Sequence, residues 1–193
     1  RCARWSRGLG DVYKRQILTK PIGTGTLFAA DMRRKARGRW IDAAIHTMLL
    51  SNQAAAECLR DFGVSACTDV TGFGLLGHLI EMTRSAGVDA ELSIDDIPIL
   101  AGAAETVAAG ILSSLQPQNL RLRRAVRDLE SAARHPRYPL LFDPQTAGGL
   151  LASVPGARAE DCILALKACG YPETALVGRV LARSEAAEPI VLS

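Results

Sequence analysis

The chain has few aromatic residues, which make up only 5% of its 193 residues. Its charges are nearly balanced, with 23 basic and 20 acidic residues, and no extended basic stripe is interleaved with aromatic residues. Domains that bind nucleic acids usually carry such a basic surface. We therefore expect no nucleic-acid partner.

Long apolar runs and paired cysteines are also missing. No apolar run approaches the roughly 20 residues that a membrane-spanning helix needs, and the N-terminus lacks the apolar core of a signal peptide. The five cysteines are odd in number and form no C-x-x-C pair. This usage favours reduced, mostly buried thiols over a disulfide framework. We therefore expect a cytoplasmic protein without a membrane partner.

Apolar residues make up 48% of the chain and charged residues 22%, which is ordinary for a globular domain. Period-2 and helical patterns alternate along the chain, which predicts an α+β fold, a mixed sheet with packed helices. Strands are expected at 17–21, 66–71, 90–94, 138–142, 150–154, 175–181 and 189–192, and helices at 42–62, 74–85, 98–110, 119–134 and 159–168. Gly87 is expected to end the helix at 74–85.

Residues 1–16 show neither helical nor strand periodicity and carry five basic side chains. Such a segment cannot bury enough apolar surface to offset the entropy of ordering it. We therefore expect residues 1–16 to be unstructured or foreign to the fold, and one domain to cover residues 17–193.

The most informative stretch reads Ala-Cys-Thr-Asp-Val-Thr-Gly-Phe-Gly-Leu-Leu-Gly-His and covers residues 66–78. A β-prone run leads Asp69 to a bend with Gly72, Gly74 and Gly77. The G-x-G-x-x-G spacing usually indicates dinucleotide binding. Asp69, however, would repel a pyrophosphate unless a cation lay between them. Because Mg²⁺ takes oxygen ligands from carboxylate and phosphate together, the stretch indicates a metal–nucleotide site with Asp69 as the metal ligand.

Each of these residues also has a plain structural interpretation. Asp69 could cap the following helix, although Thr71 is nearer to the helix start. Gly72 and Gly74 could allow a tight turn, and in addition leave backbone N–H groups free to approach a phosphate. His78 is expected to be a packed or hydrogen-bonded residue without a catalytic role.

This stretch resembles a motif in the C-terminal half of selenophosphate synthetase (selenide, water dikinase), within the aminoimidazole ribonucleotide synthetase-like group. Residues 141–151, Leu-Phe-Asp-Pro-Gln-Thr-Ala-Gly-Gly-Leu-Leu, are similar to the late motif of that family. Residues 18–25, Leu-Thr-Lys-Pro-Ile-Gly-Thr-Gly, are similar to the strand that opens the same half. The three motifs occur in family order and span roughly residues 17–185. The Asp143–Gly149 loop is expected to support the site structurally.

The resemblance implies the C-terminal α/β-sandwich domain of the aminoimidazole ribonucleotide synthetase-like fold. It also implies a reaction in which ATP, selenide and water give selenophosphate, AMP and phosphate, with Mg²⁺ as cofactor and Asp69 as its ligand. In the family, a preceding N-terminal domain supplies the reactive cysteine or selenocysteine, the catalytic lysine and most of the dimer contacts. No catalytic residue is therefore assigned here, and this chain alone is expected to be inactive.

Three alternatives stay open at this point. The chain could be another ATP-using member of the same group. It could be a dinucleotide-binding Rossmann domain, with Asp89 or Glu91 recruited to bind a ribose. Finally, it could be a non-catalytic interaction module.

Overall fold

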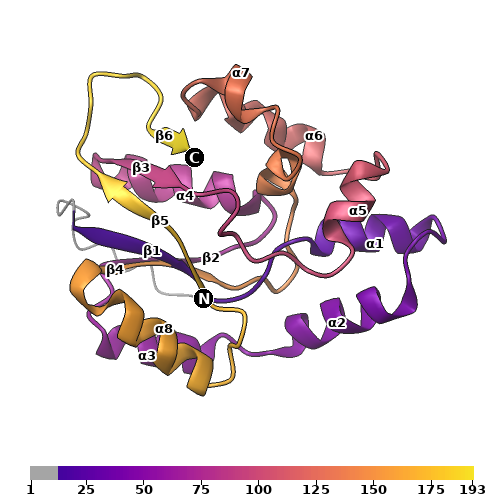
Figure 1. Ribbon diagram of the computed structural model, residues 1–193, viewed down its shortest axis with the longest axis horizontal. Coiled ribbons are helices and arrows are strands. Elements are labelled where there is room, and N and C mark those ends of the chain that lie inside the picture. The colour runs from indigo at the N-terminus through magenta and orange to yellow at the C-terminus, as the bar shows by residue number, and fades with distance from the viewer. Residues whose placement is uncertain (1–12) are drawn as a thin grey trace.

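The computed structural model describes residues 13–193 and has an α+β fold, as expected (Figure 1). Its six-stranded mixed sheet has the order β2-β4-β1-β5-β3-β6. Neighbouring strands are antiparallel, except that β3 and β6 are parallel. The strands are β1 (Lys14–Leu18), β2 (Ala66–Asp69), β3 (Asp89–Leu92), β4 (Leu150–Pro155), β5 (Ala175–Leu181) and β6 (Ile190–Leu192).

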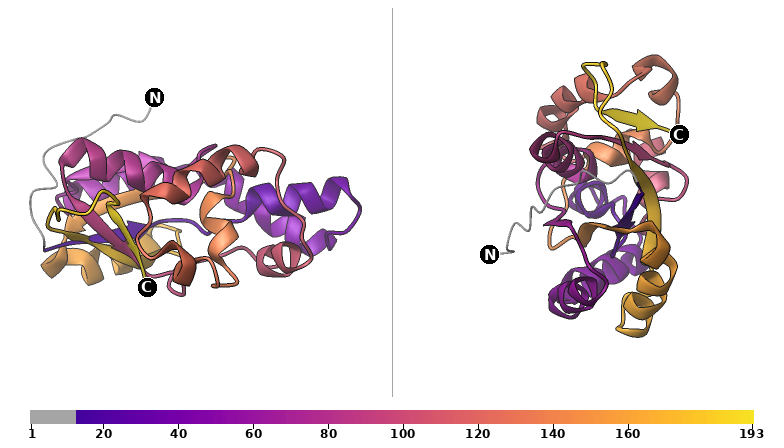
Figure 2. Two further views of the ribbon diagram at one scale, coloured as in Figure 1. Left: turned by 90° about the horizontal axis from the view of Figure 1, so that it is seen from above. Right: turned by 90° about the vertical axis from the view of Figure 1, so that its left-hand side faces the viewer.

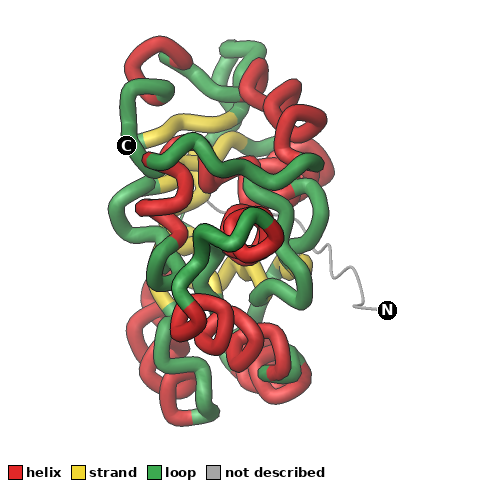
Figure 3. The backbone as a smooth tube through the Cα atoms, turned by 90° about the vertical axis from the view of Figure 1, so that its right-hand side faces the viewer, coloured by secondary structure: helices red, strands yellow, loops and turns green. Residues whose placement is uncertain are grey.

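Helices surround the strands, as the tube drawing makes plain (Figure 3). The α-helices are α1 (Thr24–Met32), α2 (Gly38–Leu49), α3 (Gln53–Asp61), α4 (Gly74–Ala86), α5 (Ala103–Ala108), α6 (Gln116–Asn119), α7 (Leu129–Ala132) and α8 (Ala159–Ala168). Short 3-10 helices are η1 (Leu120–Ala125), η2 (Tyr138–Phe142) and η3 (Gly156–Arg158). No helix within residues 13–193 is long and apolar enough to cross a membrane.

The core lies on both faces of the sheet, and strand β4 explains why. Its side chains alternate: Leu150 and Ala152 join the cluster formed with α3 and α8, whereas Leu151 joins the larger cluster that contains α4. Successive residues of a strand point to opposite faces, so a strand buried on both sides reads as a continuous apolar run. Figure 1 shows α3 and α8 side by side against the sheet.

The sheet begins earlier than the sequence indicated. Lys14, Arg15 and Gln16 belong to β1 and pair with β4, and Gln16 is fully buried. The expected boundary at residue 17 is therefore three residues late, because the pairing of β1 with its neighbours extends the strand. The rest of the N-terminal segment, residues 1–12, lies outside the described part of the chain.

The expected helix at 42–62 is two helices, α2 and α3, interrupted at residues 50–52. At the break, the Lys20 ammonium donates a hydrogen bond to the Leu50 carbonyl, and the Tyr171 hydroxyl donates one to the Ser51 carbonyl. Side chains from distant segments therefore donate hydrogen bonds to carbonyl oxygens that would accept backbone hydrogen bonds in a continuous helix. Helix α1 was not expected at all.

Two other expectations were wrong. The region 119–134 forms η1 and α7 instead of one helix, because Val126 bridges Ile190 and Asp128 adopts a positive φ of 45°. The run Tyr138–Phe142 is the 3-10 helix η2 and not a strand, since a short apolar run does not distinguish a buried strand from a buried helix. In contrast, α4, β2, α8 and β4–β6 lie close to where they were expected, and Gly87 ends α4 with φ 67°.

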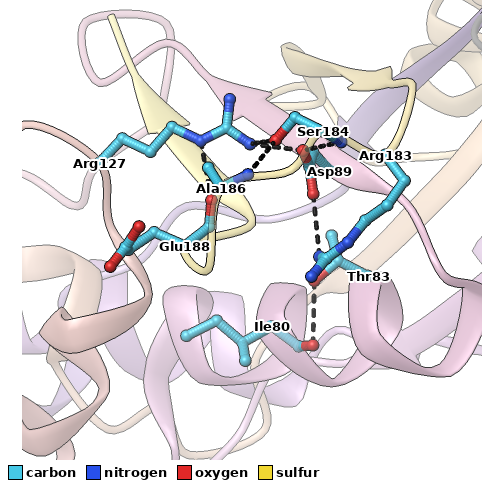
Figure 4. Close-up of polar contacts among 8 residues, drawn as sticks. All are labelled: Ile80, Thr83, Asp89, Arg127, Arg183, Ser184, Ala186 and Glu188. Atoms are coloured by element: carbon cyan, nitrogen blue, oxygen red, sulfur yellow. Dashed lines mark hydrogen bonds and ion pairs between the residues drawn. The ribbon is translucent and has the colours of Figure 1, made fainter.

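An ionic cluster around the buried carboxylate of Asp89 holds the C-terminal segment beside β3 (Figure 4). The carboxylate of Asp89 is fully buried and accepts hydrogen bonds from Arg127, from Arg183 at 3.0 Å and from the Ser184 backbone at 2.9 Å. Burial alone would raise the pKa of Asp89, but the Ser184 hydrogen bonds and the Arg127 charge hold it below its usual value. The cluster thereby holds residues 183–190 beside β3, the strand with which β6 pairs.

Candidate functional site

Asp69 is the last residue of β2, an edge strand of the sheet. It lies opposite Leu150 of β4, and its side chain is half-buried. No side-chain hydrogen bond caps α4, so the structure gives Asp69 no helix-capping role. Within residues 13–193, no hydrogen bond or ion pair engages its carboxylate. This oxygen pair is thus available to a ligand at the sheet edge.

The bend after Asp69 is held by His78. The Thr71 backbone N–H donates a hydrogen bond of 3.0 Å to Nε2 of His78, which lies 3.2 Å from the Thr71 hydroxyl. Burial lowers the pKa of His78 below its usual value, which favours the neutral ring whose Nε2 can accept this hydrogen bond. His78 therefore fixes the bend, in agreement with its expected role as a hydrogen-bonded residue.

The two glycines of the candidate site, Gly72 and Gly74, differ in backbone conformation and in whether their N–H group is engaged. Gly74 has φ +71°, and its N–H donates to the Thr71 carbonyl at 3.0 Å. A Cβ at Gly74 would lie 2.8 Å from the carbonyl carbon of Phe142, so no other residue fits there without strain. Gly72 is exposed, a Cβ there would meet nothing within 4 Å, and no acceptor for its N–H lies among residues 13–193. Of the two, Gly72 has the free N–H.

The loop from Asp143 to Gly149 packs directly on this bend. The Gln145 backbone N–H donates to the Thr71 carbonyl at 3.0 Å, and the Val70 N–H donates to the Gly149 carbonyl at 2.8 Å. A Cβ at Gly148 would lie only 2.2 Å from the Val70 oxygen. The two motifs, far apart in the sequence, therefore form one surface.

The same loop also holds the start of α1. The side-chain oxygen of Gln145 accepts hydrogen bonds from the backbone N–H groups of Gly23 and Thr24, at 2.9 and 3.2 Å. Asp143 accepts one from the Gly25 N–H at 3.0 Å. Burial raises the pKa of Asp143 to about 7. These contacts agree with the loop's expected supporting role, and they bring the third motif, residues 18–25, to the same place.

Lys20 is the residue that sequence reasoning missed. Its side chain is 2% exposed, and its ammonium donates to the carbonyls of Leu50 and, at 3.1 Å, Ala147. Burial lowers the pKa of Lys20 below its usual value. Asn52 adds a hydrogen bond of 2.8 Å to the Gly148 carbonyl. Lys20 and Asn52 thus connect the break between α2 and α3 to the Asp143–Gly149 loop. In the sequence, the only sign of this role of Lys20 was a charged residue near the end of the strand expected at 17–21.

The described residues supply little for a metal by themselves. No group of three or more His, Cys, Asp or Glu residues within residues 13–193 could hold a metal ion. A half-buried, unpaired carboxylate is nevertheless a suitable single ligand for Mg²⁺, which commonly takes its other ligands from phosphates and waters. Asp69 could therefore hold a metal only as one ligand of a shared set.

The sheet topology excludes the dinucleotide-binding alternative. A Rossmann domain places its glycine motif between parallel strands of a βαβ unit. Here β2 pairs antiparallel with β4, and Gly74 uses its N–H inside the turn. The G-x-G-x-x-G spacing therefore serves a turn of a different fold.

The chain has clear relatives among known proteins. The family described as AIR synthase related protein, C-terminal domain, matches residues 17–188. A protein named selenide, water dikinase 2, from Peptoclostridium acidaminophilum, is 38% identical over 169 residues, or 88% of this chain and 48% of the relative. A selenide, water dikinase from Desulfitobacterium hafniense (strain Y51) is 36% identical over 188 residues, or 97% of this chain and 54% of the relative. The chain thus spans about half the length of the curated relatives it matches.

Solved structures have the same fold. The hydrogenase maturation protein HypE of E. coli superimposes with a TM-score of 0.65 at 19% identity, covering 99% of this chain and 49% of that one. HypE in complex with ATP gives a TM-score of 0.66 at 17% identity, covering 98% and 48%. Since the family match covers most of the described residues and the fold agrees, the chain belongs to the family described as AIR synthase related protein, C-terminal domain.

Proposed function

We propose that this chain is the C-terminal half of a selenophosphate synthetase, which makes selenophosphate, AMP and phosphate from ATP, selenide and water. The observation that carries the proposal is the junction of three motifs: the Asp69 bend, the Asp143–Gly149 loop and residues 18–25 meet at one place. Relatives named selenide, water dikinase, at 35–41% identity, support the same assignment.

In this proposal Asp69 holds Mg²⁺ against the phosphates of ATP, and Gly72 donates its free N–H to a phosphate oxygen. Mg²⁺ supplies the charge neutralisation that phosphoryl transfer requires. His78 and the Asp143–Gly149 loop keep the bend in position, while Gly74 provides the turn. Because one carboxylate holds Mg²⁺ weakly, the remaining ligands are assigned to a preceding N-terminal domain.

The proposal includes partners outside this chain. The reactive thiol or selenol, the catalytic lysine and the homodimer contacts belong to that N-terminal domain, so the chain alone has no activity. The cysteines of the described region, Cys58, Cys67, Cys162 and Cys169, form no disulfide bond with one another, which suits a reducing compartment, and we propose the cytoplasm.

A chimaeric protein tests this function. The N-terminal half of the Desulfitobacterium hafniense relative is fused to residues 13–193, and AMP release from ATP is measured with and without selenide. We expect AMP and selenophosphate only when selenide and Mg²⁺ are both present. ATP turnover that ignores selenide would instead assign the chain to another ATP-using member of the group. A folded chimaera without any ATP turnover would contradict the catalytic assignment and favour an interaction module.

A further inference from the structure

The connection between α1 and α2 concentrates positive charge. Residues 32–41 read Met-Arg-Arg-Lys-Ala-Arg-Gly-Arg-Trp-Ile and contain no acidic residue. Their five cationic side chains, Arg33, Arg34, Lys35, Arg37 and Arg39, are all exposed. The whole chain has a net charge of only +3, so this basic loop is far more positive than the rest of the protein.

Asp31 and Asp42 border the basic loop in the sequence, but no carboxylate in the described part of the chain forms an ion pair with any of its five cations. The guanidinium of Arg37 lies over the Trp40 ring, 5.1 Å from its centroid. Neighbouring like charges repel each other, and a bound anion reduces this repulsion. The non-glycine residue Arg34 has φ 56°, which turns the chain sharply within the loop.

An open surface cavity of about 350 Å³ adjoins the basic loop. Its walls are Trp40, Ile99, Leu100 and Gly102, with Arg39 and Glu105 among the lining residues. The indole of Trp40 packs so closely on Gly102 that a Cβ there would lie 2.1 Å from the ring. The cavity therefore combines apolar walls with one cationic and one anionic group, and its volume falls within the range of small-molecule sites.

We propose that the basic loop and this cavity form a binding site for a nucleotide. The flat apolar ring of the base fits the cavity, where the Glu105 carboxylate accepts a hydrogen bond from an exocyclic amino group. The guanidinium groups of Arg37 and Arg39 bind the phosphates, and Arg33 and Lys35 add attraction over a longer range. The same phosphate-and-base chemistry could come from a free nucleotide or from a nucleic-acid strand, and we assign the free nucleotide because the cavity is small.

This site is separate from the Asp69 bend. Figures 1 and 2 place the connection between α1 and α2 at one end of the molecule, away from the strands of the sheet. The proposed nucleotide site needs neither Mg²⁺ nor Asp69, because side-chain cations supply the positive charge that binds the phosphates. The inference therefore does not depend on the proposed dikinase activity, and the two can be tested apart.

Titration calorimetry of the 193-residue chain with ATP, in EDTA and at low salt, tests the site. We expect metal-independent binding that weakens about tenfold in Arg37→Gln/Arg39→Gln, equal to about 1.4 kcal/mol. Arg121→Gln/Arg124→Gln, which removes the same charge from exposed residues elsewhere, is the matched control and should bind within about twofold of the parent. Asp69→Asn should also bind normally.

Two further variants separate the cavity from simple charge. Ala101→Trp fills the cavity mouth and should weaken ATP but leave pyrophosphate binding unchanged. Arg33→Gln/Lys35→Gln spares the Trp40 contact and should reduce the salt dependence of ATP binding. Absence of ATP binding, or equal losses in the loop and control variants, would overturn the proposal. Loop-dependent binding of a single-stranded oligouridylate without ATP binding would also overturn it, and assign the loop to nucleic acid.

Discussion

The backbone N–H of Gln145 donates a hydrogen bond of 3.0 Å to the carbonyl oxygen of Thr71. This one contact joins the Asp143–Gly149 loop to the bend that follows Asp69. Gln145 holds the start of α1 through its side chain at the same time, so its backbone and side chain together bring three separate sequence motifs to one surface.

Replacing Asp69 with Asn in the chimaera should abolish selenide-dependent AMP formation and leave the fold intact. The substitution removes the charge that attracts Mg²⁺ but keeps the size of a half-buried side chain that caps no helix. Activity is measured over a Mg²⁺ titration, and thermal unfolding is the control for folding. Asp161→Asn, at an exposed position in α8, should behave as the parent. Normal turnover of Asp69→Asn at limiting Mg²⁺ would contradict the metal role.

Gly74→Ala should destabilise the chain by about 2–4 kcal/mol, because it places a Cβ at positive φ and against the Phe142 backbone. Gly72→Ala is the matched control: its backbone lies outside the left-handed region and its surroundings are open, so we expect a loss below about 1 kcal/mol. Urea unfolding of both variants measures the difference. Equal losses of unfolding free energy in the two variants would contradict the prediction, because they would show that the turn at Gly74 accommodates a Cβ without strain.

Asp143 should make stability depend on pH. Its pKa is raised to about 7 by burial, so the folded state binds more protons than the unfolded state between about pH 4 and pH 7. The protonated carboxyl therefore stabilises the fold fully below that window, and this contribution is lost as the pH rises through it. Asp143→Asn keeps the shape but cannot ionise. We expect the free energy of unfolding of Asp143→Asn, relative to that of the parent, to increase by about 2–4 kcal/mol from pH 4 to pH 8, so that the variant becomes relatively more stable. A pH-independent difference would contradict the raised pKa.

Lys20→Met should loosen the Asp143–Gly149 loop without unfolding the sheet. The change leaves the Leu50 and Ala147 carbonyls without their charged donor, and hydrogen bonds to charged groups contribute about 1.5–3 kcal/mol. Amide hydrogen exchange should accelerate at Val70 and Gln145, whose N–H groups bridge the loop and the bend. Exchange in β5, away from the loop, serves as the internal control. Acceleration throughout the chain would indicate global destabilisation instead.

Local sequence pattern was sufficient to predict the elements whose formation depends on neighbouring residues. The strand predicted at 66–71 is β2, which ends at Asp69, and the helix predicted at 74–85 is α4, which ends before Gly87 as expected. These predictions were close because turn glycines and helical spacing act through neighbouring residues. Local pattern also placed the Asp69 carboxylate beside a tight glycine bend. It also indicated that His78 is hydrogen-bonded and that residues 143–149 form a supporting loop.

Contacts between distant segments decided the rest. The break between α2 and α3 exists because Lys20 and Tyr171 take the carbonyls of residues 50 and 51, and no pattern within residues 42–62 encodes those donors. Pairing of Val126 with Ile190 likewise replaces a helix that the local spacing favoured. Local patterns therefore predicted the motifs and most of the strands. Which backbone groups meet followed from the folded arrangement, since a hydrogen bond between remote residues depends on where the whole chain places them.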